Sequence, residues 1–279
     1  ERLTARMTPA PFLSVLMDDC IEKGKDYYDG GPRYNTSYIQ CTGLGTVTDS
    51  LSAIKKHIYE DRKWSMKELL QVLSQNFKDH EPMRQFLLNR TPFFGNDDDY
   101  ADSLAVRLYE DMFRAIDGKP NSRGGVFHMD LLSTTCHVYF GSVTGALPNG
   151  RIAGRSLSDG TSPSHGADTN GPTAVIRSLS RLDQEKSGGT LLNQRFSPSM
   201  MKTDRDLEKL ASLIRCYFES GGHHIQFNVV DTQTLRKAQK EPELYRDLMV
   251  RVAGYSDYFN HLAPALQEDI ICRTMNREI

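Results

Sequence analysis

The chain has 279 residues, of which 25% are charged and 38% hydrophobic, and its formal net charge is −2. This composition is typical of a soluble globular protein with one large or two smaller domains. Because no long basic or acidic run occurs, nothing favours nucleic acid or an anionic membrane surface as a partner. No apolar stretch approaches the ~18 residues that a membrane-spanning helix requires, so we expect no membrane span.

Five cysteines are scattered along the chain, without a CxxC motif or a Cys/His metal-binding spacing. This pattern favours reduced thiols in the cytoplasm over disulfides, and we expect no metal site. The chain starts with Glu1 rather than Met, and its first residues resemble the interior of a helix without an apolar signal core. We therefore expect a cytoplasmic protein and a chain that is a fragment or a processed piece.

Helical patterns begin near the N-terminus, where a helix over 10–24 is expected to end at Gly24. The segment 204–219 is expected to present one apolar helical face, formed by Leu207, Leu210, Ala211, Ile214 and Phe218. Asp231 is expected to cap a further helix. The other predicted helices are 47–60, 66–77, 98–115, 170–182 and 263–274.

Short β-strands are predicted between these helices, at 38–41, 126–131, 189–196, 224–230 and 248–253. The alternation of strands and helices predicts the α/β class, with an open sheet or half of a barrel, because five β/α units do not close a barrel. The long segment 141–170 is rich in Gly, Ser, Pro and Asp and is predicted to be irregular.

Four features resemble functional motifs but have simpler interpretations. The adjacent histidines 223–224 would point to opposite faces of a strand and share a metal ion poorly. The aspartates 97–99 are expected to form a solvated, capping start of a helix. The segment 42–46 precedes a helix as a phosphate-binding loop does, but it lacks the third glycine and the lysine. Cys136 is followed by a histidine, yet an isolated buried cysteine usually serves packing.

The most informative segment is 250–259, which reads VRVAGYSDYF. From the pattern alone, the ordinary interpretation is a buried strand that ends in a turn, where Gly254 supplies a backbone conformation that other residues resist. The same segment also resembles a known family motif, which gives the glycine a second, chemical interpretation.

Residues 251–255 resemble the glycyl radical loop of the pyruvate formate-lyase and glycerol dehydratase superfamily, and they lie about one helix before the C-terminus, as in that family. Further segments resemble the family in the same order, and these are 146–151, 157–163, 168–174 and 222–230. The resemblance covers most of residues 30–275. It implies that 1–279 is the C-terminal half of a glycyl radical enzyme, with 230–279 as the glycyl radical domain. The implied fold is a ten-stranded α/β barrel built of two five-stranded halves, of which this chain supplies the second.

The resemblance implies that Gly254 is the radical-carrying residue. A radical at Cα is stabilised by the flanking amide nitrogen and carbonyl if the centre can flatten, and a side chain would crowd that arrangement. Because radicals need a dry, enclosed site, we expect Gly254 at the tip of a loop in the barrel interior, poorly exposed. In this family no bound cofactor is needed. A separate activating enzyme with an iron–sulfur cluster and S-adenosylmethionine installs the radical, which then passes to a cysteine thiol.

One departure from the family is the catalytic cysteine, which usually lies in a Cys-x-Glu motif. No cysteine of this chain has Glu two positions later. The resemblance therefore implies that an upstream half of the same enzyme carries this loop and is a partner of the present chain. The other expected partners are the activating enzyme, a small-molecule substrate and a second copy in a homodimer.

Within the family, the chain is most similar to the branch that removes water from trans-4-hydroxy-L-proline to give a pyrroline carboxylate. The segments that carry this similarity are 30–35, 133–141 and 188–194. Carried over to this sequence, Thr134 would contact the substrate at the end of a barrel strand. An equally good interpretation is that its hydroxyl satisfies a nearby backbone group.

Two alternative functions stay open. The chain could belong to another lyase on the same scaffold, such as a diol dehydratase, a carbon–nitrogen lyase, an arylacetate decarboxylase or a formate acetyltransferase-like enzyme. It could also be a spare-part subunit that replaces a damaged radical domain. Such subunits resemble only the last stretch around the glycine loop, and a resemblance that starts near residue 30 argues against this role.

Overall fold

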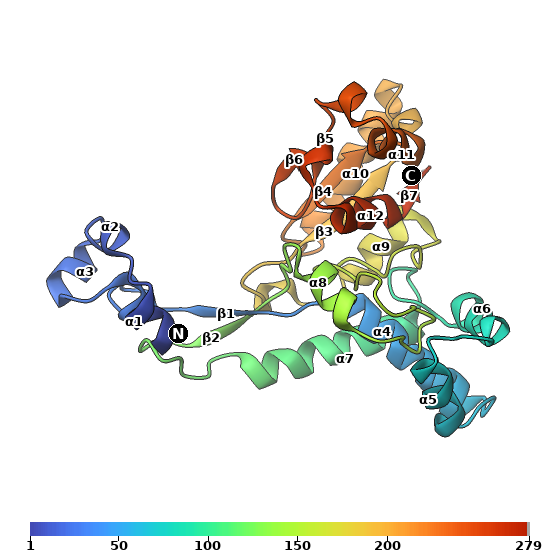
Figure 1. Cartoon of the computed structure of the whole chain (residues 1–279), viewed down its shortest axis with the longest axis horizontal. Helices are drawn as coiled ribbons and strands as arrows, with labels where there is room; N and C mark the ends of the chain where they lie inside the picture. Colours follow the sequence, from blue (N-terminus) through green and yellow to red (C-terminus); the bar gives the residue numbers. More distant parts are fainter. Residues whose placement is uncertain (278–279) are drawn as a thin grey trace.

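The structure is a computed structural model and describes residues 1–277. Helices α1 (Arg2–Met7), α2 (Pro11–Ser14) and α3 (Asp18–Lys23) form a small lobe at one end of the molecule (Figure 1). The paired strands β1 (Ser37–Gln40) and β2 (Phe127–Asp130) join this lobe to the main body. The C-terminal elements, orange to red in Figure 1, gather at the top of that view.

Helices make up most of the main body. They are α4 (Leu44–Ala53) with its continuation as a π-helix (Ile54–Glu60), α5 (Met66–Ser74), α6 (Glu81–Arg90), α7 (Asp99–Ile116), α8 (Cys136–Val143), α9 (Gly171–Leu179), α10 (Asp204–Glu219), α11 (Thr232–Lys240) and α12 (Pro264–Cys272).

Most predicted helices are present, and their ends follow from local capping. Helix α10 spans the predicted residues, because Thr203 and Asp206 form a reciprocal capping box at its start. Helix α7 begins after Asp98, whose carboxylate accepts a 2.9 Å hydrogen bond from the Tyr100 N–H. The predicted helix over 10–24 is divided into α2 and α3, although it ends at Gly24 as expected, with a left-handed φ of +59°.

Three expectations about helices were wrong. Helix α6 was not predicted, and α8 occupies the start of the segment that was expected to be irregular. The buried residues of α10 are Leu213 and Tyr217, whereas Leu207 and Phe218 of the predicted apolar face are exposed. Leu210 of the predicted face still packs against the apolar cluster, so the buried face overlaps the predicted one only in part.

Within residues 1–277 the strands form three small sheets. Strand β1 pairs with β2 in parallel, and β3 (Leu192–Phe196) pairs in parallel with both β4 (Ile225–Val229) and β7 (Met275–Asn276). Strands β5 (Met249–Arg251) and β6 (Ser256–Tyr258) form an antiparallel hairpin. A single parallel bridge between Leu131 and Thr190 connects the end of β2 to the start of β3.

The predicted α/β class is confirmed, and each of the five predicted strands is present. The strands do not form one continuous sheet, because β5 pairs with β6 rather than continuing the ladder of β4. The five-stranded half of a barrel therefore stays a prediction.

Two apolar clusters hold the main body together around the strands. One lies between β2, β3, β4 and the helices α7, α9 and α10, with Leu179, Leu192 and Tyr217 fully buried. The other packs α11 and α12 against the β5–β6 hairpin, with Leu235, Val250 and Ile270 at its centre. The hairpin is thus anchored on its apolar side by ordinary core packing.

Candidate functional site

The β5–β6 hairpin carries Gly254 at its tip. Val252 donates its N–H to the Tyr255 carbonyl over 2.9 Å, which closes the turn around the glycine. Gly254 has a left-handed φ of +78°, a conformation that costs other residues about 1–2 kcal/mol. Val252 and Ala253 are buried in the apolar cluster, whereas Gly254 and Tyr255 are exposed.

Gly254 is exposed in this chain, and its expected shelter inside a complete barrel stays a prediction. A Cβ added to Gly254 would meet no atom within 4 Å, so its backbone conformation and not crowding favours glycine here. The physical reason is that three short separate sheets do not enclose a barrel interior. Residues 1–277 therefore position the glycine without sheltering it.

Two side-chain amides of β4 hold the hairpin. The Gly254 N–H donates to Gln226 Oε1 over 3.0 Å, and Gln226 Nε2 donates to the Val252 carbonyl over 3.1 Å. Asn228 Oδ1 accepts a 2.8 Å hydrogen bond from the Arg251 N–H, and Asn228 Nδ2 donates a 2.8 Å hydrogen bond to the Arg251 carbonyl. Gln226 and Asn228 point to the same side of β4 because side chains alternate along a strand.

A buried arginine forms a second support for the hairpin. Arg273 Nη2 donates to the Val252 carbonyl over 3.0 Å and lies 3.2 Å from Asp269 Oδ2 and 3.5 Å from Asp159 Oδ2. Asn193 donates to Asp159 and accepts from Gln226, which closes a continuous polar path. The path joins the turn that contains Gly254 to a cluster of buried charges.

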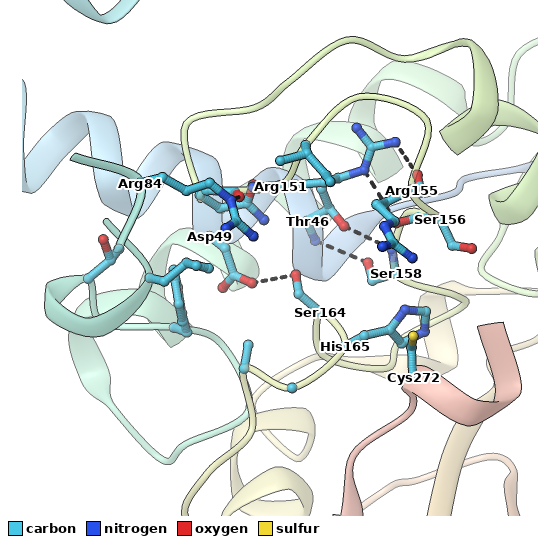
Figure 2. A pocket seen from close by; sticks show the side chains of 18 of the residues that line it. Thr46, Asp49, Arg84, Arg151, Arg155, Ser156, Ser158, Ser164, His165 and Cys272 are labelled. Carbon is cyan, nitrogen blue, oxygen red and sulfur yellow. Dashed lines mark hydrogen bonds between the residues drawn. The ribbon is translucent and has the colours of Figure 1, made fainter. Parts of the chain in front are cut away.

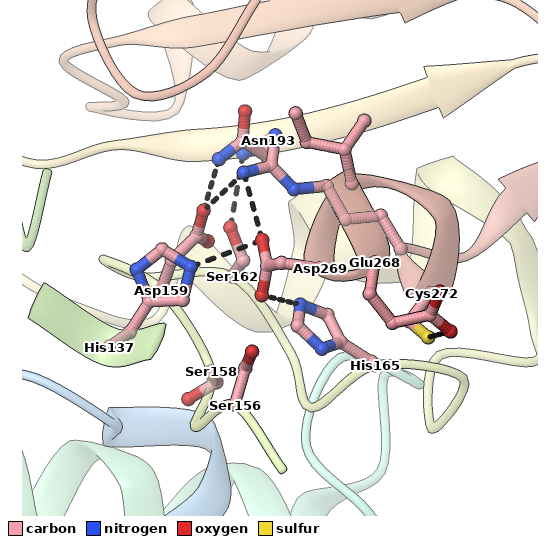
Figure 3. Close-up of polar contacts among 12 residues, drawn as sticks. His137, Ser156, Ser158, Asp159, Ser162, His165, Asn193, Glu268, Asp269 and Cys272 are labelled. Carbon is pink, nitrogen blue, oxygen red and sulfur yellow. Dashed lines mark hydrogen bonds and ion pairs between the residues drawn. The ribbon is translucent and has the colours of Figure 1, made fainter. Parts of the chain in front are cut away.

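The centre of this cluster is Asp269 on α12 (Figure 3). His137 Nε2 lies 3.1 Å and His165 Nε2 lies 3.5 Å from the two carboxylate oxygens, and His137 and Asp269 are fully buried. Burial works to raise the pKa of Asp269, but His165, His137 and Arg273 outweigh it and hold the pKa well below its usual range. Burial works to lower the pKa of His137, but Asp269 outweighs it and raises the pKa. The pair therefore favours a carboxylate beside an imidazolium.

A cleft of about 960 Å³ opens beside this cluster (Figure 2). Asp269 and His165 form part of its wall, together with Cys272, whose pKa is raised by burial and by Glu268. Asp49 is fully buried in another part of the wall, where it accepts a 2.8 Å hydrogen bond from the Phe94 N–H and a bond from the Ser164 hydroxyl. Burial raises the pKa of Asp49 to about 7, so its proton is held near neutral pH.

Thr134 lies beyond the end of β2 and is half-buried, with a left-handed φ of +48°. Its hydroxyl donates to the Ser133 carbonyl over 2.8 Å, the backbone contact that one of the two interpretations expected. The neighbouring Leu132 packs against the apolar cluster that contains Val252 and Ala253. The segment after β2 is thus brought to the hairpin, but Thr134 does not line the cleft.

The weaker motifs take structural roles. At the N-terminus of α4, Thr46 and Ser158 exchange two hydrogen bonds of 3.0 and 2.8 Å, each from a backbone N–H to a side-chain oxygen. The segment 42–46 therefore makes an internal contact at the start of the helix. Asp97 pairs with Arg177 and Arg181 at the start of α7. No group of metal-ligating side chains occurs in the part of the chain that the structure describes.

Known families match two stretches of the chain. Pyruvate formate lyase-like proteins match residues 1–141, and the glycine radical family matches residues 157–260, which include Gly254 and both β4 amides. The chain belongs to the glycyl radical enzyme superfamily.

Individual relatives agree with this family. The chain is 51% identical over 98% of its length to a trans-4-hydroxy-L-proline dehydratase of Clostridioides difficile, and 42% identical over 99% to an isethionate sulfite-lyase of Oleidesulfovibrio alaskensis. It covers 35% and 34% of these relatives, so it spans about a third of their length.

Solved structures of family members have the same fold over this stretch. The Clostridioides difficile hydroxyproline dehydratase with its substrate matches with a TM-score of 0.94 at 50% identity, covering 99% of this chain and 35% of that one. The glycerol-bound B12-independent glycerol dehydratase of Clostridium butyricum matches with a TM-score of 0.92 at 47% identity, covering 98% and 35%. Among the described residues, no helix combines the length and hydrophobicity required to cross a membrane.

Sequence reasoning did not single out Gln226, Asn228, Asn193, Arg273 or Asp269 as site residues. A signal exists for the first two, because the segment 225–229 reads IQFNV and alternates amides with apolar residues. In a strand this alternation places both amides on one face, and a buried amide face requires hydrogen-bonding partners. Asp269 and Arg273 lie four residues apart, a spacing that brings side chains at a helix end together.

Proposed function

We propose that this chain is the C-terminal, radical-storing part of a glycyl radical dehydratase, with Gly254 as the radical-carrying residue. The observation that carries the proposal is Gly254 at the tip of the β5–β6 hairpin, with its N–H held by Gln226 over 3.0 Å. The glycine lies within the stretch that the glycine radical family matches. An activating enzyme with an iron–sulfur cluster and S-adenosylmethionine supplies the radical chemistry.

The mechanism uses Gly254 as a store and not as the group that attacks the substrate. Hydrogen abstraction from its Cα leaves a radical that the two adjoining peptide groups stabilise. The radical then passes to a cysteine thiol in an upstream half that carries the Cys-x-Glu loop. The thiyl radical removes a hydrogen atom from the carbon next to the ring nitrogen of the substrate, and a carboxyl group of the same half assists the departure of the hydroxyl as water. The dehydrated radical then takes the hydrogen atom back from the cysteine, which regenerates the thiyl radical and completes the product.

The proposed substrate is trans-4-hydroxy-L-proline, and the product is a pyrroline carboxylate. The support is the 51% identity to the Clostridioides difficile hydroxyproline dehydratase. Thr134 would contribute a hydroxyl to the pocket wall, exchanging its present bond to Ser133 for one to the substrate. This role requires the upstream half to complete a ten-stranded barrel, of which this chain would supply the second five-stranded half. The complete enzyme would be a homodimer in the cytoplasm. Residues 230–279 would form the radical domain, and the last two lie outside the described residues.

A second candidate is another lyase on the same scaffold, because this chain is also 42% identical to an isethionate sulfite-lyase and 47% identical to a glycerol dehydratase. A spare-part radical subunit is a weaker candidate, since the match to pyruvate formate lyase-like proteins begins at residue 1 and extends far upstream of the glycine loop.

Substrate competition tests the proposal. The complete enzyme, activated without oxygen, is supplied in parallel with trans-4-hydroxy-L-proline, glycerol and isethionate, and product formation is compared per radical. We expect turnover of hydroxyproline at least 100-fold above the other two, because a pocket that hydrogen-bonds a substrate strongly rejects molecules that lack the matching groups. If the enzyme converts only glycerol or only isethionate, hydroxyproline is not its substrate.

A further inference from the structure

Strand β5 is attached to its neighbour β4 in an unusual way. The two strands lie side by side, but they belong to different sheets and share no backbone ladder. In place of that ladder, the carboxamides of Gln226 and Asn228 bond to the backbone of residues 251–254, each through one donated and one accepted hydrogen bond. Each amide thus imitates the donor and acceptor pair that a strand would offer.

These two amides occupy buried positions on β4, where apolar side chains would ordinarily stand. Gln226 and Asn228 are only 4% and 5% exposed, while Ile225 and Phe227 on the opposite face of the strand pack into the apolar cluster. A buried amide is unfavourable unless its donors and acceptors are satisfied. Here the loop supplies the partners for both amides, and Asn193 supplies one more to Gln226. The loop and the amides therefore depend on each other.

The contact at Gly254 bears directly on the radical centre. The bond from the Gly254 N–H to Gln226 Oε1 fixes the peptide plane on one side of Cα, and an acceptor on this N–H increases electron donation from the nitrogen. The bond from Gln226 Nε2 to the Val252 carbonyl fixes the chain two residues earlier. Gln226 therefore spans the turn that contains Gly254 and sets the orientation of the group that stabilises the radical.

We propose that Gln226 and Asn228 are positioning residues of the radical loop: Asn228 fixes the strand that leads into it, and Gln226 orients the Gly254 amide for radical storage and transfer. This inference rests on the proposed role of Gly254. It assigns no bond-making step to the amides, which act through the loop.

The matched variants are Gln226→Met, which removes both hydrogen bonds to the loop and the one to Asn193, and Gln226→Glu, which keeps an acceptor for the Gly254 N–H. Gln194 is the control, because it is a buried amide on the adjacent strand β3 whose partner is Asn276 and not the loop. Gln194→Met loses a buried amide of the same kind, so it reproduces the structural effect without touching Gly254.

The first measurement is hydrogen exchange at the Gly254 amide in the complete enzyme before activation. We expect exchange to be about tenfold faster in Gln226→Met, the factor that corresponds to one lost hydrogen bond, and unchanged in Gln194→Met. Gln226→Glu should restore most of the protection. Equal exchange in the parent and in Gln226→Met would overturn the proposal.

The second measurement is made after anaerobic activation. In Gln226→Met we expect a changed ¹⁵N hyperfine coupling of the radical's amide nitrogen and a turnover per radical reduced about tenfold. Gln194→Met should keep the parent values of both. An unchanged coupling together with unchanged turnover per radical would overturn the role in radical chemistry. A parent enzyme without any radical would instead overturn the proposed function, and the exchange comparison would still decide whether Gln226 holds Gly254.

Discussion

Strand β4 contacts β3 and β5 through different kinds of bond, and the difference bears on both fold and function. Towards β3 it forms a parallel backbone ladder over five residue pairs, with Phe196 and Phe227 packed together at 5.6 Å between ring centroids. Towards β5 it offers only side-chain amides. A backbone ladder is independent of residue type, whereas an amide contact is lost by one substitution. The comparison teaches that the sheet fixes the fold, while the loop with Gly254 is attached by replaceable contacts.

Replacing Gly254 itself should have the largest effect, because it removes the proposed radical site and leaves the β3–β4 ladder intact. Gly254→Ala should abolish turnover and radical formation, because Cβ hinders both hydrogen abstraction and flattening of Cα. The fold should survive, since an added Cβ meets no atom within 4 Å and the strain of the left-handed φ costs only about 1–2 kcal/mol. Oxygen exposure of the activated parent should cleave the chain at Gly254 and release the piece that follows it. Mass spectrometry of an inactivated parent that stays intact would contradict this assignment.

The buried charges around Asp269 should behave as part of the permanent structure. Asp269→Asn leaves the buried His137 without its carboxylate and Arg273 with Asp159 alone, which should cost about 3–5 kcal/mol of unfolding free energy. Glu268→Gln is the control on the same helix, because Glu268 is partly exposed and pairs with Arg236 at the surface, where such a pair contributes about 0–1 kcal/mol. Urea unfolding of both variants decides the point, and equal losses would show that the buried cluster has no special weight.

Thr134 sharpens the comparison from the substrate side. Thr134→Val keeps the shape and removes the hydroxyl, so kcat/KM for hydroxyproline should fall by the equivalent of ~1–3 kcal/mol, the scale of a buried polar group left without its partner. Radical content should not change, because the storage site is separate. Steady-state kinetics on the complete activated enzyme measure the effect. A variant with unchanged kcat/KM would leave Thr134 with its backbone bond to Ser133 alone and favour the other lyase functions.

Asp49 gives a prediction for the pH dependence of stability, and its sign can be worked out. Its folded pKa of about 7 lies above the ordinary 3.8, so the folded state binds more protons between these values and stability falls as pH rises from about 4 to about 7. Asp49→Asn should reduce this slope without removing it, because burial also raises the pKa values of Asp102 and Asp168 to about 6. Unfolding free energies at several pH values test this, and an unchanged slope would mean that Asp49 is ionised in the folded state.

Sequence reasoning succeeded where a local pattern decides the structure. The limits of α10 match the segment 204–219 that its apolar periodicity predicted, and the position of Gly254 after a strand follows from one short segment. It failed where distant residues decide. Nothing local shows that β5 bonds to β4 through side chains, or that His137, His165 and Asp269 from separate segments meet in one buried cluster. The shelter expected for Gly254 is likewise a property of a whole barrel and not of a strand pattern.

The most direct test of the central claim is electron paramagnetic resonance of the complete enzyme after anaerobic activation, with glycine carrying ¹³C at Cα. We predict a radical signal whose splitting increases with the label in the parent and which is absent in Gly254→Ala. A signal that is insensitive to the label, or that persists in Gly254→Ala at parental intensity, would contradict radical storage at Gly254.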